Sequence, residues 1–203
     1  MTGPVDEEKR ATLRRFAAVG AATPFVGTAA GDDPDDNETR EAIRGYLATT
    51  PGAHFSKLRD DLQLGTGETQ YHLDTLVDDG VIKTRKNGDY RRFYLTGRFS
   101  AFEQRALGYL RRRTPRRVVI ALLRDPATSA SEIAATAGVS PASISGAAAS
   151  LEAGGLLTRE SGYSLERPET LTLLLVRFAG SFDEDTVEFA AEADTILQYD
   201  PKS

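Results

Sequence analysis

Residues 70–96 read QYHLDTLVDDGVIKTRKNGDYRRFYLT, and this stretch decides the fold of the chain. Its beginning belongs to a helix that we expect from about Thr66 to Asp78, because its apolar positions recur on one helical face. Those positions are Thr69, Leu73, Leu76 and Val77. Gly80 predicts a left-handed cap that ends this helix.

A hairpin is expected directly after the helix. Its strands are predicted at residues 81–85 and 90–95, and Asn87-Gly88 between them is a signal for a tight turn. Two helices are expected upstream, one ending at Pro51-Gly52 and a shorter one over Ser56–Leu62. Three helices followed by a hairpin is the order of a winged helix-turn-helix module.

The same pattern returns 75 residues later without a gap. Residues 55–82 read FSKLRDDLQLGTGETQYHLDTLVDDGVI, and residues 130–157 read ASEIAATAGVSPASISGAAASLEAGGLL. Matching positions include Leu58 with Ile133, Leu76 with Leu151, and Gly80 with Gly155. The repeat predicts a mainly α fold with small β-hairpin wings (α+β): two tandem winged helix-turn-helix modules with N- and C-terminal accessory helices.

Residues 70–96 resemble the recognition helix and wing of archaeal ArsR-like winged-helix regulators. The ordered pair of modules is similar to archaeal tandem winged-helix transcription regulators, over roughly residues 39–166. This resemblance implies a DNA-binding transcription regulator. Two positions depart from the family: Gly65 stands where Ser is usual, and Glu68 where Thr is usual. Glu68 would repel phosphates, or it would accept a hydrogen bond from a cytosine amino group.

Charge is distributed unevenly along the chain, whose formal net charge is −5. Residues 81–117 carry 12 Lys or Arg against 2 Asp or Glu, whereas residues 1–80 and 160–203 are acidic. A basic centre between acidic ends predicts one anion-facing surface on an acidic body. Chance clustering on solvated helix faces is the alternative.

The first module is expected to read double-stranded DNA with the N-terminal part of its third helix in the major groove. The exposed candidates on that helix are Thr66, Gly67, Glu68, Gln70, Tyr71 and Thr75. Gln70 can pair with adenine, and Tyr71 can reach a phosphate or a thymine methyl group. The hairpin is expected to contact backbone phosphates through Arg85, Lys86, Arg91 and Arg92. An ordinary exposed helix face is the alternative.

The second module is a weaker candidate, because residues 140–151 carry no charged side chain. Its candidate DNA contacts are Ser140, Ala142, Ser143, Ser145 and Arg159. Dimerisation or docking on the first module is an equally supported role. Between the modules lies an arginine run with Arg112, Arg113, Arg116 and Arg117, which either clamps a phosphate or pairs with the acidic C-terminal region.

Four segments are expected along the chain. They are an N-terminal helix and acidic linker (1–37), the first module (38–98), a linker helix and the second module (99–166), and a C-terminal helical segment (167–203). The apolar run 16–30 is shorter than the about 20 residues that span a bilayer, and Pro24 interrupts it. We expect it to pack on the body or on a second subunit; an interfacial membrane anchor is the alternative. Accessory helices of this kind predict a homodimer.

The sequence carries no signature of catalysis or of a bound cofactor. It has no cysteine, two histidines, and no Walker loop, dinucleotide fingerprint or GxSxG motif. We therefore expect no enzyme, no cofactor and no metal. Arginine outnumbers lysine 20 to 5 and acidic residues are plentiful, a composition that resembles haloarchaeal proteins; a high genomic GC content is the alternative. The absence of cysteine is compatible with a reducing cytoplasm, where we expect the protein. The rival hypothesis is a winged-helix protein-interaction or scaffold module without sequence-specific DNA binding.

Overall fold

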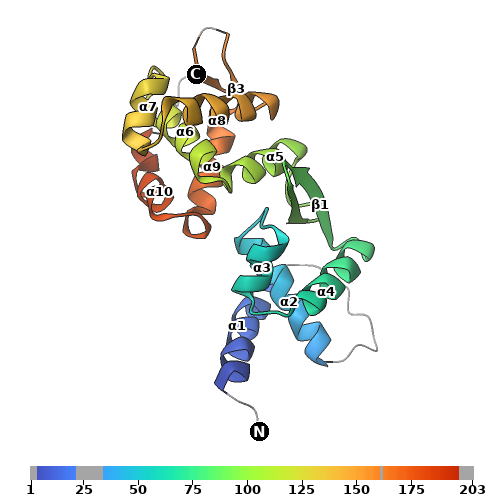
Figure 1. Ribbon diagram of the computed structural model, residues 1–203. Coiled ribbons are helices and arrows are strands. Elements are labelled where there is room, and N and C mark those ends of the chain that lie inside the picture. The colour runs from blue at the N-terminus through green and yellow to red at the C-terminus, as the bar shows by residue number, and fades with distance from the viewer. Residues whose placement is uncertain (1–3, 22–33, 161, 197–203) are drawn as a thin grey trace, which may run out of the picture. The chain divides into compact units, whose positions relative to one another are not determined.

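A computed structural model describes residues 4–21, 34–160 and 162–196 of the chain (Figure 1). It contains two compact units, Met1–Ser100 and Ala101–Ser203. In the described residues each unit is mainly helical and carries one small antiparallel sheet of two strands, which confirms the expected fold class. None of the helices in the described ranges combines the length and hydropathy needed to cross a bilayer.

The first unit contains the predicted three helices and hairpin. Its elements are α1 (Pro4–Ala21), α2 (Pro34–Thr49), α3 (Phe55–Asp61), α4 (Thr66–Asp78), β1 (Ile82–Asn87) and β2 (Tyr90–Leu95). The core between them is aliphatic, with Ile43 of α2, Leu58 of α3 and Leu73 of α4 almost fully buried. The helix predicted over residues 66–78 is confirmed at both ends, and the first strand of the hairpin extends two residues further than expected.

The end of α4 determines where the hairpin begins. Gly80 has a φ of +69°, and its amide donates to the Val77 carbonyl at 3.0 Å, while the Val81 amide donates to the Leu76 carbonyl at 3.0 Å. These two bonds form a Schellman cap, which needs the left-handed conformation that glycine adopts without strain. The predicted cap is therefore confirmed, and it turns the chain sharply into β1.

The hairpin, or wing, is aligned by regular antiparallel pairing from Ile82 with Leu95 to Asn87 with Tyr90. Gly88 and Asp89 form the two-residue turn, and Gly88 has the positive φ of +59° that tight hairpin turns require at this place. The inner edge of β2 also pairs with the chain after α2. There the Gly52 amide donates to the Phe93 carbonyl at 2.9 Å, and the Phe93 amide donates to the Ala53 carbonyl at 3.0 Å.

Helix α1 packs along α2. Leu13 is buried, and the Phe16 ring lies edge-on to the Tyr46 ring with centroids 5.3 Å apart. Gly20 and Gly45 bring the two backbones together so closely that a Cβ at Gly45 would collide with the Phe16 carbonyl. The expectation that the N-terminal helix packs on the body of the protein is therefore confirmed for residues 16–21 of the apolar run. Residues 22–30 of that run lie outside the described residues.

The second unit repeats the helix-turn-helix order. Its elements are α5 (Ala101–Leu110), α6 (Arg113–Arg124), α7 (Ala130–Ala137), α8 (Pro141–Ala153), β3 (Leu157–Thr158), β4 (Ser164–Leu165), α9 (Pro168–Arg177), η1 (Ala179–Ser181) and α10 (Glu184–Ile196). Both ends of α8 fall 75 residues after those of α4, and Gly155 repeats the left-handed cap of Gly80. The internal repeat therefore extends to backbone geometry.

The C-terminal helices belong to the second unit. Helix α9 packs on α5, and α10 packs on α6 and α9. Their buried faces include Leu171, Leu175 and Phe189, each fully buried. The helical segment expected from residue 167 thus consists of two α-helices over its described part, and they complete the core of this unit.

Candidate nucleic-acid interface

Helix α4 presents its first turns to solvent. Thr66, Gly67, Gln70 and Tyr71 are exposed, and Tyr71 is the most prominent apolar group of the helix at 56% exposure. The Thr69 hydroxyl turns back to donate to the Gly65 carbonyl at 2.8 Å, which anchors the start of the helix. A Cβ at Gly67 would meet nothing within 4 Å, so the surface here is open to a close approach.

The same helix carries negative charge that sequence analysis passed over. Asp74 and Asp78 are exposed, and α4 has no Lys or Arg. The Gln70 amide nitrogen donates to an Asp74 carboxylate oxygen at 2.8 Å. To act as the expected adenine reader, Gln70 would have to exchange this bond for one to a base. The i, i+4 spacing of Gln70 and Asp74 on a helix is the signal that could have revealed the pair.

Glu68 and Thr75 are only partly exposed, at the flank of the expected DNA-facing surface. The Glu68 carboxylate accepts from the Gly65 amide at 3.1 Å, as the acidic residue of a capping box does. It also accepts from the Lys9 ammonium of α1, at 2.9 and 3.0 Å to its two oxygens. The Thr75 hydroxyl donates to the Tyr71 carbonyl at 2.9 Å. Both side chains are therefore engaged within the protein.

The two histidines of the first unit are at least partly buried. His54 caps α3, with its Nδ1 accepting from the Lys57 amide at 3.3 Å and its ring 4.8 Å from the Tyr90 ring. Burial lowers the pKa of His54, and the nearby Arg92 lowers it further. His72 lies on the buried side of α4, and burial lowers its pKa while the neighbouring Asp36 carboxylate opposes that shift. Both rings are therefore neutral near pH 7.

The wing gathers exposed cations near its tip. Lys86 and Arg91 are direct cross-strand partners and share one face of the hairpin. Both are exposed, and neither has an ion-pair partner among the described residues. The Arg91 guanidinium lies over the Phe93 ring, 5.4 Å from its centroid. Like charges placed directly opposite each other destabilise a hairpin, so this pair favours an anionic partner that would relieve the repulsion.

The opposite face of the wing carries the other cations. Arg85 is half-buried there, and Lys83 is exposed nearer the base of the hairpin. Sequence analysis missed Lys83, although its position in the same strand, two residues before Arg85, places both side chains on one face. Arg85, Lys86 and Arg91 thus retain the surface position that a phosphate contact requires.

Arg92 does not fit its expected role. Its side chain is only 2% exposed, with Nη1 donating to the Gly52 carbonyl at 2.9 Å and Nε donating to the Asn87 amide oxygen at 3.4 Å. Arg91 and Arg92 point to opposite faces of the hairpin because consecutive residues of a strand do so, and the Arg92 side chain meets the turn at Gly52. The expectation that Arg92 contacts phosphate is corrected: it ties the wing to the turn after α2.

The candidate residues of the second module lie at the start of α8 and on its short hairpin. Ser140 caps the helix, accepting from the Ser143 amide at 3.2 Å, and the two hydroxyls lie 2.9 Å apart. Ala142 and Ser145 are exposed beside them. Arg159 donates to the Glu152 carboxylate at 2.7 Å through Nε. The cation of this wing is therefore neutralised within the module, in contrast to Lys86 and Arg91.

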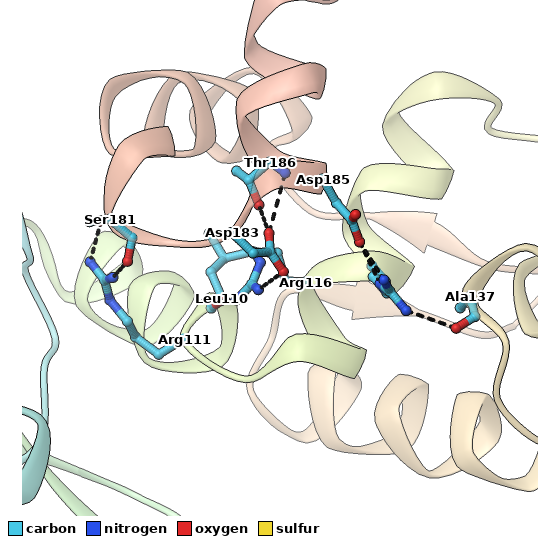
Figure 2. Close-up of polar contacts among 9 residues, drawn as sticks. Leu110, Arg111, Arg116, Ala137, Ser181, Asp183, Asp185 and Thr186 are labelled. Carbon is cyan, nitrogen blue, oxygen red and sulfur yellow. Dashed lines mark hydrogen bonds and ion pairs between the residues drawn. The ribbon is translucent and has the colours of Figure 1, made fainter.

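The arginine run between the modules serves the interior of the second unit (Figure 2). Arg116 is 5% exposed and binds the Leu110 carbonyl and the Asp183 carboxylate. Arg117 bridges the Ala137 carbonyl and the Asp185 carboxylate, each at 2.8 Å. Of the two alternatives for these residues, the structure supports pairing with the acidic C-terminal region, and the phosphate clamp is corrected for both.

Two further arginines of the run remain nearer the surface. Arg112 donates to the Ser150 hydroxyl at 2.9 Å, and Arg113 is exposed at the start of α6. Arg111, which was not a candidate, donates to the Ser181 carbonyl at 2.7 Å (Figure 2). Its guanidinium also lies over the Phe182 ring. Within the run Arg116 is buried, Arg113 is exposed and the other three arginines are half-buried, a distribution that the sequence alone did not resolve.

Comparison with known families adds two matches. Residues 37–107 match the family model HTH_HVO_0163_N, described as an N-terminal HTH domain, and residues 105–163 match the model MarR_2 of the MarR family. Neither the curated proteins nor the solved structures gave a match. In the described residues no group of three or more acidic or histidine side chains has the arrangement of a metal site. The two matches support a DNA-binding transcription regulator built from tandem winged helix-turn-helix modules.

Proposed function

We propose that the chain regulates transcription by binding double-stranded DNA through its first module, with α4 in the major groove and the wing tip on the phosphate backbone. The observation that carries this proposal is the exposed pair Lys86 and Arg91, which face each other across the hairpin without an ion-pair partner among the described residues. Such a pair is stabilised by a polyanion lying across the wing.

The first turns of α4 supply the reading surface. Thr66 and Gly67 present small groups that let the helix backbone come close to a groove, and Tyr71 offers a large ring with a hydroxyl. Gln70 pairs with adenine once its amide leaves Asp74. Exchange of an exposed hydrogen bond costs little, because water is the competing partner before binding.

The acidic side chains of α4 set a limit on affinity and favour selectivity. Asp74 and Asp78 repel any phosphate near the C-terminal half of the helix. Binding therefore depends on the wing and on the N-terminal half of α4. A DNA sequence without an adenine for Gln70 leaves Gln70 bonded to Asp74, and the Asp74 carboxylate then repels the nearby phosphates. Affinity for such a sequence is lower, which is a repulsive contribution to specificity.

A salt series with a labelled random-sequence duplex tests the wing. The change is Lys86→Ala plus Arg91→Ala, and the matched control is Arg124→Ala plus Arg177→Ala, which removes the same charge from exposed positions in the second unit. The wing variant should bind about tenfold or more weakly, with a log–log salt slope smaller by about 2. The control should keep the wild-type slope.

Equal behaviour of the two double variants would show that net charge alone governs binding and would refute the wing contact. No binding by the wild-type chain at low salt would refute DNA binding as a whole and favour the interaction-module hypothesis.

A second experiment selects the preferred DNA site from a pool of random sequences and compares binding to that site with binding to random DNA. Gln70→Ala should abolish preference for a selected site while leaving random-sequence binding within about twofold.

A halophilic source makes the base contacts more important. Counterion release drives little binding at molar salt, so affinity there must come from hydrogen bonds and apolar contacts. Gln70 and Tyr71 are the exposed groups of α4 that offer them. If the chain works in molar salt, the selected site should retain affinity under conditions in which random DNA no longer binds.

We further propose that the chain acts as a homodimer through its accessory helices. Leu173 and Val176 of α9 and Val187 of α10 are exposed by 59%, 37% and 48%, although their neighbours on the same helices are buried. Exposed aliphatic groups on two packed helices favour a protein partner. Leu173→Glu should shift sedimentation from dimer to monomer; a wild-type chain that sediments as a monomer at micromolar concentration would refute this interface.

A further inference from the structure

One acidic side chain of α4 pairs with a cation from outside the helix-turn-helix. Lys9 of α1 holds both oxygens of Glu68, at 2.9 and 3.0 Å, and the two side chains are about equally exposed, at 29% and 32%. They are separated by 59 residues in sequence. Glu68 lies in the first turn of α4, where a free carboxylate would repel the phosphates that flank the major groove.

We propose that Lys9 is a positioning residue for DNA binding, which makes α1 an electrostatic part of the recognition surface. Lys9 neutralises Glu68 and holds it against the Gly65 amide, so that Glu68 caps the helix and does not extend toward DNA. This inference rests on the proposed DNA-binding function. It also assigns Glu68 a different role from base reading.

The docking of α1 is rigid enough to deliver this lysine. Leu13, one helical turn after Lys9, is buried against the core of the first module. Further along, Gly20 and Gly45 bring the α1 and α2 backbones into direct contact. Lys9 is thus held at the start of α4 by packing along most of the length of α1. Its ammonium need not be drawn there by the weak attraction of an exposed ion pair.

The test uses the full chain and a fluorescein-labelled random-sequence duplex at low salt. Lys9→Ala should weaken binding about 3- to 10-fold, because an unscreened carboxylate then faces the phosphates at the front of α4. Glu68→Gln in the Lys9→Ala background should restore binding to within about twofold of wild type, since the amide carries no charge. Lys9→Arg should bind as wild type does.

Two controls separate this role from simple packing. Arg10→Ala removes the neighbouring exposed cation of α1, and its effect, if any, should not be rescued by Glu68→Gln. Thermal unfolding of Lys9→Ala and of the double variant should agree within a few degrees, so that rescue of binding is not rescue of folding.

The inference is overturned if Lys9→Ala binds as wild type does, or if Glu68→Gln fails to rescue it. Either result would leave the proposed function intact provided that the wing variant Lys86→Ala plus Arg91→Ala still loses affinity. If the wild-type chain does not bind the duplex, the proposed function and this inference fail together.

Discussion

Two neighbouring arginines of β2 should respond in opposite ways to the same substitution. Arg91 is exposed near the tip of the wing, whereas Arg92 is buried and donates to the Gly52 carbonyl at 2.9 Å. Arg91→Met and Arg92→Met each remove a guanidinium and keep an unbranched stem of similar length. Comparison of the two variants therefore reports what each guanidinium does.

The magnitude for Arg92→Met comes from the bond it loses. A hydrogen bond from a charged donor contributes about 1.5–3 kcal/mol, and a buried carbonyl left without a partner costs about 1–3 kcal/mol. These effects overlap, and removing a buried charge recovers part of its desolvation cost. We expect a net loss of about 2–3 kcal/mol. Arg91→Met should change stability by less than about 0.5 kcal/mol, as exposed substitutions usually do.

Urea unfolding of the full chain, followed by far-ultraviolet circular dichroism, measures the difference. A loss of this size should lower the midpoint of the transition that includes the first unit by about 1–2 M. Duplex binding should show the reverse order, with Arg91→Met weakened and folded Arg92→Met close to wild type. The reasoning is refuted if Arg92→Met unfolds at the wild-type urea concentration and loses DNA affinity as Arg91→Met does.

Three further substitutions test the packing and the electrostatics of the two units. Gly45→Ala should undock α1, because the new methyl group would collide with the Phe16 carbonyl; protease cleavage within α1 should rise at least tenfold, and unchanged cleavage would contradict the close contact. Burial raises the pKa of Asp183, but hydrogen bonds from Arg116 and Thr186 outweigh it and hold the pKa below its ordinary value. The stability that Asp183 contributes is therefore present above about pH 4 and lost as pH falls through the lower folded-state value; Asp183→Asn should remove this pH dependence, and a wild-type slope in the variant would contradict it. Ser140→Ala should cost about 1 kcal/mol in urea unfolding by removing the cap of α8, whereas a value near zero would show that the hydroxyl is not needed there.

Local signals in the sequence were sufficient for the secondary structure of the first module. The apolar face of the helix, the glycine after it and the glycine of the hairpin turn act over a few residues, so their geometry is determined by near neighbours. The turn itself lies at Gly88-Asp89, one residue later than the predicted Asn87-Gly88. The ends of α4 at Thr66 and Asp78 were predicted correctly for this reason. The internal repeat also predicted α8, whose own pattern of apolar residues is a weaker helix signal than that of α4.

The candidate site was less predictable because it depends on contacts between distant segments. Sequence alone does not show that Arg92 meets the turn at Gly52, forty residues away, or that Lys9 reaches Glu68. The alternation of faces along a strand could separate Arg91 from Arg92, but it cannot say which face is buried. Charge counting likewise could not decide whether Arg116 binds a phosphate or pairs with the acidic C-terminal region, and the structure shows it paired with Asp183.

The contact between Lys9 and Glu68 has a practical consequence for how the chain is handled. Helix α1 begins at Pro4, shortly before Lys9, and Lys9 meets the first turn of α4. An affinity tag or fluorescent fusion attached ahead of α1 would therefore crowd the very surface that a binding assay reports on. Affinities measured with amino-terminal tags should therefore be repeated after the tag is cleaved.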